Sequence, residues 1–298
     1  MNERKHIAGA VEVVVVNWNA GEYLGRCIDT LYSCHPAHQL RVTVVDNASS
    51  DCSIEGVKSR EWVKVIANGS NRGFAAAVNQ GLAALSDDTA YVLILNPDIE
   101  FSEDVLSNLL DFFDRNPRAG VLTARIANPD GSLQTTCRRR EPSPWSMLSR
   151  LSGLANLFPH SDFFAGYTYG GTDSSQSHKV EAVSGSFMLI RRELLKKVES
   201  FDERYFMYAE DLEFCRSARQ AEWEIWYVSQ PGAVHHGGVS SSRRAVRSMW
   251  HKHCTACRYL NSSLRHDYPA ILRWPLSVVV MGLFPPRALW VWMVGLFR

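Results

Sequence analysis

The sequence lacks several features that would place it in a special class at once. Its 298 residues carry a formal net charge of +1, so no excess of positive charge points to nucleic acid as a partner. Seven cysteines are scattered without a regular spacing, which is typical of a reducing compartment and argues against a secreted disulfide framework. Residues 1–9 are polar and the next apolar run contains Glu12, so we expect no cleavable signal peptide. No internal repeat is found.

The glycine-rich fingerprints of common nucleotide enzymes are also missing. Neither Gly-x-Gly-x-x-Gly nor a P-loop occurs, which argues against a dinucleotide dehydrogenase and a kinase. Residues 17–21 supply no phosphate loop for a nucleotidyltransferase. Asp46 stands at the end of a predicted strand, where a Rossmann enzyme holds a ribose, so cofactor binding stays an alternative.

Alternating strand and helix patterns fill the first part of the chain. Apolar runs at 11–16, 40–45, 63–67 and 91–95 predict four strands, and helical spacing predicts helices from residue 21 and over 74–85. Three strand-to-helix units before a fourth strand require right-handed crossovers. We therefore predict a Rossmann-like α/β fold with a mainly parallel central sheet and helices on both faces.

The pattern is less regular after residue 100. We predict a helix capped by Ser102 that runs to about Asn116, a strand over 120–127, and a hairpin partner over 132–137 after the turn at 128–131. Residues 138–178 lose the pattern, which is typical of a lid or a binding loop. Regular structure resumes with an apolar run over 183–190 and helices over 193–198 and 211–221.

Polar residues follow the predicted strands. They are Asn17 and Asn19, Asp46 and Asn47, Asn71 with Arg72 and Gly73, and Asn96 with Asp98. Because parallel strands end at one edge of their sheet, we expect a nucleotide to lie across these ends. The loop 71–74 offers backbone amides and a helix N-terminus to a diphosphate, and Gly73 allows a close approach.

The ordered motifs resemble the inverting family-2 glycosyltransferases, which have the A-type nucleotide-diphospho-sugar transferase fold, and most closely their rhamnosyltransferase-like branch. The resemblance spans about residues 11–242. Its motifs lie at residues 15–19, 45–49, 71–74 with Asn79 and Gly81, 95–98, 184–187, 209–213 and 235–240. Seven motifs in this order are specific together, although each alone is weak.

The resemblance implies roles for individual residues. It assigns donor binding to Asn17, Asn19, Asp46, Asn47, Asn71, Arg72, Gly73, Asn79 and Asn96, and acceptor binding to Ser184 and Gly185. Within the donor set, Asp46 contacts the base or the ribose. Asp98 would hold a divalent cation, Mg²⁺ or Mn²⁺. His235 is expected to approach this cation, and His236 is the less favoured of the two histidines. Asn96 stands where the family motif has Asp and lacks its charge, which weakens the hold on the ion.

An inverting transferase needs a carboxylate that takes the proton of the acceptor hydroxyl. Asp211 is our choice, and Glu210 is the alternative because consecutive residues at a helix start point about 100° apart. The presence of acids at 98 and 211 favours an active enzyme over a silent nucleotide-sugar-binding relative.

We divide the chain into a catalytic domain, residues 1–240, and a C-terminal part, residues 241–298. A basic helix is predicted over 241–264, and two apolar runs at 276–284 and 288–297 are each shorter than the roughly 20 residues of a bilayer span. Tryptophans and arginines beside them favour insertion into a membrane interface, with packing on the catalytic domain or in a homodimer as the alternative. His251, His253, Cys254 and Cys257 match no common zinc spacing, and a helix surface is favoured.

Resemblance and tail together predict the function. We expect transfer of L-rhamnose from dTDP-L-rhamnose to a hydroxyl of a cell-envelope glycan or a polyprenyl-diphosphate-linked acceptor. A UDP-sugar is the alternative donor. The tail places the reaction at the inner, cytoplasmic face of the cell membrane.

Overall fold

The computed structural model describes residues 10–36, 40–237 and 245–295 of the chain. Val239, Ser240, Arg243, Arg244 and the predicted boundary between residues 240 and 241 lie outside these residues. The division into two parts therefore stays a prediction.

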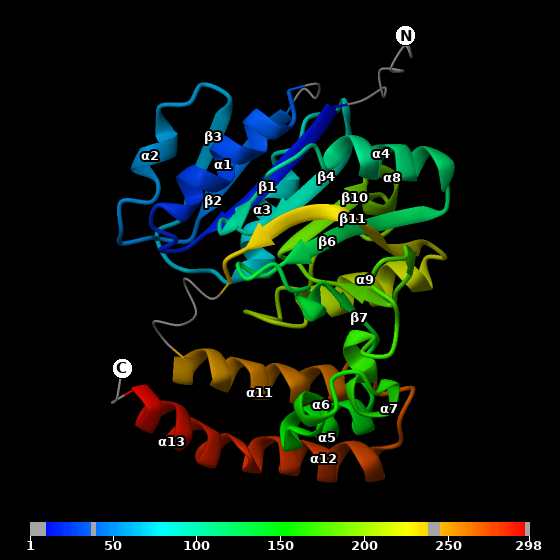
Figure 1. Ribbon diagram of the computed structural model, residues 1–298. Helices are drawn as coiled ribbons and strands as arrows, with labels where there is room; N and C mark the ends of the chain where they lie inside the picture. Colours follow the sequence, from blue (N-terminus) through cyan, green and yellow to red (C-terminus); the bar gives the residue numbers. More distant parts are fainter. Residues whose placement is uncertain (1–9, 37–39, 238–244, 296–298) are drawn as a thin grey trace.

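Among the described residues, the centre of the fold is a nine-stranded sheet (Figure 1). Its strands follow the order β3-β2-β1-β4-β10-β6-β11-β5, and β8 pairs with β11. The bounds are β1 (Ala10–Asn17), β2 (Leu40–Asp46), β3 (Val63–Ala67), β4 (Thr89–Leu95), β5 (Ile99–Glu100), β6 (Ala119–Ala127), β8 (His178–Lys179), β10 (Phe187–Arg191) and β11 (Glu224–His235). A second, two-stranded sheet joins β7 (Arg138–Arg139) to β9 (Ala182–Val183).

The strand directions confirm the predicted fold class. β3, β2, β1 and β4 are parallel to one another, and β11 is parallel to β6. β10 runs antiparallel between β4 and β6. In this register Asn17 is opposite Asp46, so the polar strand ends meet at one edge of the sheet.

Helices cover the sheet and form a further layer beneath it in Figure 1. The helices nearest the sheet are α1 (Tyr23–Cys34), α2 (Glu55–Lys58), α3 (Phe74–Ala83), α4 (Leu106–Arg115), α8 (Arg192–Leu195) and α9 (Glu210–Gln220). The lower layer contains α5 (Pro144–Ser152), α6 (Leu154–Leu157), α7 (Asp162–Ala165), α11 (Ala245–Asn261), α12 (Ala270–Gly282) and α13 (Phe284–Gly295). Two short 3₁₀ helices are η1 (Thr135–Cys137) and η2 (Gly166–Thr168).

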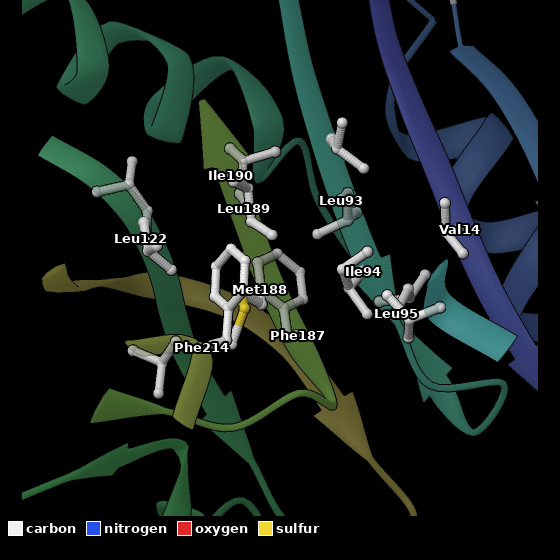
Figure 2. Close-up of a cluster of buried hydrophobic side chains, with 14 of the residues drawn as sticks. Val14, Leu93, Ile94, Leu95, Leu122, Phe187, Met188, Leu189, Ile190 and Phe214 are labelled. Carbon is white, nitrogen blue, oxygen red and sulfur yellow. The ribbon is translucent and has the colours of Figure 1, made fainter. Parts of the chain in front are cut away.

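A cluster of buried hydrophobic side chains surrounds the pairing of β4 with β10 (Figure 2). Leu93, Ile94, Phe187 and Met188 are fully buried there, because helices cover both faces of these strands. Each such side chain contributes about 1.5–3 kcal/mol on leaving water. The chain therefore leaves β4 at a fixed position, and the turn that carries Asp98 begins there.

The helix predicted from Ser102 starts four residues later, so that prediction is wrong at its N-terminal end. Residues 99–100 pair with β11 as β5, and the buried Phe101 follows. Asp104 then accepts hydrogen bonds from the backbone N of Ser107 at 3.0 Å and from its Oγ at 2.6 Å. Strand pairing and the Asp104 cap together delay the helix to Leu106.

The hairpin predicted after the turn at 128–131 is also wrong. The turn forms, with Gly131 N donating to Asn128 O at 2.9 Å, but Leu133 makes a single bridge to Ala127. β10 pairs with β6 only at Val121 and Leu122, so the far end of this edge stays open, and Gln134 N donates to Ile126 O at 2.9 Å there. The return stops after this contact because residues 135–137 coil into a 3₁₀ turn. The chain turns into η1 and then pairs β7 with β9.

Residues 138–178 contain helices α5, α6 and α7 where the sequence predicted only irregular structure. The side chain of Ser143 accepts from Ser146 N at 3.1 Å, and Pro144 occupies the first turn of α5. These are ordinary N-terminal helix signals, and the short length of each helix hides its periodicity.

The C-terminal apolar runs form α12 and α13, which pack with α11. Pro285 and Pro286 lie in the first turn of α13, where a missing backbone N–H costs nothing. Within the described part of the chain, no helix has both the length and the apolar character needed to span a bilayer.

Candidate active site

A cavity of about 580 Å³ opens at the carboxyl edge of the parallel strands and reaches the lower helical layer. The strand ends, loop 71–74, the segment 184–186, the start of α9 and helices α5, α11 and α12 line it. Ten of the predicted site residues line this cavity: Asn47, Asn71, Gly73, Asn96, Asp98, Ser184, Gly185, Glu210, Asp211 and His235. The other five are Asn17, Asn19, Asp46, Arg72 and Asn79, which are not among the residues that line it.

Asp46 and Asn17 form a buried polar network behind the cavity wall. Asn17 Nδ2 donates to Asp46 Oδ1 at 2.8 Å and to the Oγ atoms of Ser49 and Ser53. Asp46 Oδ2 accepts from Ser49 N at 3.1 Å. Asn19 joins the same loop, since its Oδ1 accepts from Ser50 N at 2.7 Å. These side chains fix the loop that follows β2 in place.

Asn47 joins that network to the predicted diphosphate loop. Its Nδ2 donates to Gly73 O at 3.1 Å, and its Oδ1 accepts from Arg72 N at 3.4 Å. Asn71 Oδ1 accepts from Gly73 N at 2.9 Å. Gly73 has a φ of +88°, and a β-carbon there would lie 2.5 Å from Phe206 O. Glycine is therefore required at this position, and the side chain of Arg72 points away into solvent.

Asn79 lies on α3 and serves another contact. Its Nδ2 donates to Phe201 O at 2.9 Å, and its Oδ1 accepts from Phe201 N at 2.8 Å. This pair of bonds anchors the chain that leads toward Tyr208 and the cavity. The structure thus places Asn79 as a support for that segment.

Asn96, Asp98 and His235 meet at the end of β4. His235 Nδ1 lies 2.8 Å from Gln134 Oε1, and the tautomer with its proton on Nδ1 leaves the Nε2 lone pair for a metal ion. That Nε2 lies 3.0 Å from Asp98 Oδ1 and 3.4 Å from Asn96 Nδ2. Two acceptors so close require a proton or a cation between them.

The Asp98–His235 pair fits a divalent ion held jointly with a ligand. Neighbouring ligands about 2.1 Å from an octahedral Mg²⁺ lie about 3.0 Å apart, which is the separation of Oδ1 and Nε2 here. Mg²⁺ sites commonly use one or two protein groups and take the rest from phosphates and water. Among the described residues, no cluster of three or more His, Cys, Asp or Glu side chains forms a complete metal site. His236 is turned toward Glu100, with Nε2 and Oε1 3.2 Å apart.

Glu210 and Asp211 enter the cavity from a strained turn. Tyr208 and Ala209 have φ values of +69° and +64°, which side chains other than glycine rarely adopt. Helix α9 starts directly after them, and both acids are buried in its first turn. The turn points both carboxylates into the cavity.

Asp211 forms an ion pair with Arg139 and is held firmly. Its Oδ2 accepts from Arg139 at 2.7 Å and from Gly185 N at 3.0 Å, while Oδ1 accepts from Leu212 N at 2.8 Å. A carboxylate oxygen has two acceptor positions, so Oδ1 keeps one for a substrate proton. Gly185 has little room for a side chain, because a β-carbon there would lie 3.1 Å from Phe74 Cε1.

Glu210 lies in a different environment from its neighbour. Burial raises the pKa of the Glu210 carboxyl, and the negative charge of Asp211 raises it further. Its Oε2 has no hydrogen-bond partner among the described residues. Glu210 therefore tends to keep its proton while Asp211 is charged.

Sequence reasoning missed Arg139 as part of the site. The sequence shows residues 138–140 only as a run of three arginines, and in the structure each arginine has an internal partner. Arg138 donates to Thr172 O, Arg139 to Asp211, and Arg140 to Asp162. Position 139 lies 72 residues from Asp211, and no local pattern reveals such a pair.

His251, His253, Cys254 and Cys257 lie on α11. His253 Nδ1 contacts Val280 O at 2.6 Å, and Cys257 Sγ contacts Ser277 O at 3.6 Å, so these side chains join α11 to α12. The face of α11 toward the cavity presents Lys252, Thr255 and Ala256.

A family model described as "Glycosyl transferase family 2" matches residues 12–199. An N-acetylglucosaminyl-diphospho-decaprenol L-rhamnosyltransferase of Mycobacterium tuberculosis is 30% identical over 279 residues, covering 89% of this chain and 88% of the relative. The rhamnosyltransferase WbbL of Escherichia coli K12 is 24% identical, over 84% of this chain and 92% of the relative.

Solved structures share the fold at low identity. A mannosyltransferase from Pyrobaculum calidifontis in complex with GDP-Man and Mn²⁺ has a TM-score of 0.56 and 16% identity, covering 95% of this chain and 72% of that one. GalNAc-T7 with UDP, GalNAc and Mn²⁺ has a TM-score of 0.57 and 16% identity. This chain matches over 91% of its length but spans about half, 54%, of the GalNAc-T7 chain. The central sheet described above is thus that of A-type glycosyltransferases.

Proposed function

Since this chain belongs to glycosyl transferase family 2 and is an inverting glycosyltransferase, we propose that it moves L-rhamnose from dTDP-L-rhamnose to a sugar linked through a diphosphate to a polyprenol. The carrying observation is the single cavity that Asp98 and His235 line together with the charged Asp211. The two rhamnosyltransferase relatives support rhamnose as the sugar, and the mycobacterial one supports an acceptor linked through a diphosphate to a polyprenol.

The donor side of the proposal rests on the sheet edge. Asn47 and Gly73 shape the wall against which the nucleoside diphosphate lies, and Asp98 with His235 would hold Mg²⁺ or Mn²⁺. When bound, the ion neutralises charge that develops on the departing nucleoside diphosphate. Loop 71–73 contributes the shape of this wall, because the backbone N–H groups of Arg72 and Gly73 already donate to Asn47 and Asn71.

The acceptor side rests on Asp211. Its free position on Oδ1 takes the proton as the acceptor hydroxyl attacks the anomeric carbon from the face opposite the diphosphate. Ser184 and Gly185 form the neighbouring wall, and Arg139 keeps the acid charged and oriented. The configuration at the anomeric carbon inverts because the attack is a single displacement.

We further propose that the reaction takes place at the cytoplasmic membrane surface. Support comes from α12, which exposes Ile271, Trp274 and Val278, with 80%, 66% and 70% of their surfaces accessible. A polyprenol-linked acceptor is found at such a surface, and exposed tryptophan is favoured at the headgroup layer.

The test is a panel of dTDP-, UDP- and GDP-sugars with the purified full-length chain. We expect dTDP-L-rhamnose to raise the unfolding temperature, since a ligand at a hundred times its Kd adds about 2.7 kcal/mol. Mass spectrometry should show rhamnose on a short-chain sugar-diphosphate lipid. A different donor that alone protects and reacts would overturn the donor assignment.

Metal dependence is tested on the same donor. Asp98→Ala should lose the part of the stabilisation that depends on Mg²⁺ or Mn²⁺. The matched control is Asp88→Ala, which removes an exposed acid at the opposite end of β4 and should bind donor like the parent. Equal donor affinity of the parent with and without chelator would contradict the metal site.

A further inference from the structure

Two cations on the wall of the cavity have no role in the chemistry described so far. Arg150 projects from α5 and Lys252 from α11, and both line the cavity. Their helices belong to the layer beneath the sheet in Figure 1. They form the wall of the cavity across from the strand ends, which face the donor. This part of the cavity is therefore the acceptor end.

Each of the two cations is held by an aromatic ring. The Arg150 guanidinium lies 4.8 Å from the centre of the Tyr167 ring, and Lys252 Nζ lies 4.9 Å from that of Tyr208. Tyr208 belongs to the strained turn that positions Glu210 and Asp211. The rings restrict where the charges point without neutralising them.

Nearby arginines have carboxylate partners, in contrast to Arg150 and Lys252. Arg139 pairs with Asp211, Arg140 with Asp162, and Arg216 and Arg219 with Glu141. Within the described ranges, no carboxylate lies within ion-pair distance of Arg150 or Lys252. Two cations held near each other without a counter-charge favour an anion between them.

The surroundings strengthen that expectation. Desolvation lowers the pKa of Lys252, and the positive charges of Arg150 and Arg287 lower it further. Arg287 is exposed near the start of α13 and adds a third positive charge to this region. An anion with two or more charges matches such a group better than a single carboxylate.

We propose that Arg150 and Lys252 form an acceptor-side anion site that holds the diphosphate of the acceptor. This inference rests on the proposed function, and it assigns a location to the diphosphate that links sugar to lipid. Met147 and Leu151 of α5 and Val280 of α12 line the same end of the cavity, so an apolar chain can leave along them. The sugar beyond the diphosphate then lies toward Asp211.

The experiment compares two water-soluble acceptors in the absence of membrane. Both carry the same sugar on a short alkyl or prenyl chain, one through a diphosphate and one without phosphate. The variants are Arg150→Gln and Lys252→Gln, and Arg265→Gln is the control because Arg265 is exposed and does not line the cavity.

We expect the parent to favour the diphosphate acceptor, and each cavity variant to raise its KM for that acceptor roughly ten- to a hundredfold. Its kcat and its KM for the phosphate-free acceptor should change little, and Arg265→Gln should resemble the parent. Equal KM values of the parent for both acceptors, or unchanged KM values in both variants, would overturn the site.

A binding measurement separates this inference from the proposed reaction. Geranyl diphosphate is titrated into the full-length chain with dTDP present in excess to occupy the donor site. Weaker binding to both cavity variants supports the anion site even where no transfer is seen, and absence of binding to the parent overturns it. Variants that lose only binding to phosphatidylglycerol vesicles would assign the cations to lipid headgroups, and would also overturn it.

Discussion

Two adjacent acids at the start of α9 lie in different environments, and this decides their roles. Asp211 is paired with Arg139, whereas burial and the charge of Asp211 raise the pKa of Glu210. We expect Asp211→Asn to bind donor normally and to lose about a hundred- to ten-thousandfold in kcat, the usual contribution of a general base. Glu210→Gln should keep most of the turnover. Measured kcat values of the two variants decide the assignment, and the reverse result would make Glu210 the base.

The stability of the Glu210→Gln variant provides the control for that argument. The folded chain holds the Glu210 proton more tightly than the unfolded chain, so unfolding releases a proton between the ordinary pKa of 4.5 and the raised one. The parent should therefore lose stability relative to Glu210→Gln as pH rises through this window. Chemical denaturation at pH 4 and pH 7 measures the difference, and an equal gap at both values would show that Glu210 is ionised.

The sequence predicted where site residues lie in the chain better than it predicted what each of them does. Residues 210–211 stand before an amphipathic helix and are recognisable as a motif, but their protonation depends on burial and on Arg139, which is distant in sequence. Asp46 shows the same limit. Its position at a strand end predicts a ligand contact, which stays a prediction, but it does not reveal the protein partners Asn17 and Ser49.

At the scale of elements, the loop between β3 and α3 depends on one glycine. A methyl group at Gly73 would collide with Phe206 O, and the residue has a positive φ. We expect Gly73→Ala to cost about 1–3 kcal/mol in the free energy of unfolding and to weaken donor binding, because the loop must move away from Phe206. Denaturant unfolding and donor titration measure both effects.

Gly69→Ala is the matched control in the same loop. Gly69 is exposed, and a β-carbon there meets no atom within 4 Å. Its unfolding free energy and donor affinity should stay close to those of the parent. Equal losses in the two variants would mean that the loop tolerates no substitution at all, and that the contact to Phe206 is not the cause.

Helices and strands with a clear hydrophobic pattern were predicted well. Segments whose structure depends on contacts with distant parts of the chain were not. The buried runs that form β1 and β4 carry their own signal, because strands covered on both faces are largely apolar. The hairpin predicted after β6 is cut short to one bridge, because the chain enters η1 at Thr135 and continues to the pairing of β7 with β9. Helices as short as α6 and α7 have too few residues for a period to be visible.

At the scale of the whole molecule, the C-terminal helices are bound to the catalytic part. Tyr259 Oη donates to Glu141 Oε1 at 2.8 Å, and Thr255 Oγ1 donates to Met207 O at 3.1 Å. Leu276 and Val280 of α12 are buried, and Val280 lines the cavity. Removing this region would open the active site, so its surface is better tested by substitution.

The exposed face of α12 provides that test of membrane binding. Trp274 and Val278 lie on it one turn apart, opposite the buried Leu276 and Val280, so their replacement leaves the packed face intact. We expect the full-length chain to float with phosphatidylglycerol vesicles and the double variant Trp274→Ser/Val278→Ser to lose about 2–4 kcal/mol of binding, roughly thirty- to a thousandfold.

Two comparisons make the flotation result specific to α12. Tyr32→Ser removes an exposed aromatic from α1 and should leave flotation unchanged. Added salt should weaken binding further, because basic residues such as Arg265 and Arg287 contribute about 1 kcal/mol each near an anionic surface and are screened by ions.

If the parent stays in the aqueous fraction with anionic vesicles while turning over a soluble acceptor, the membrane proposal fails. The apolar face of α12 would then be a contact between two copies of this chain, which sedimentation of the same double variant would reveal as loss of a dimer.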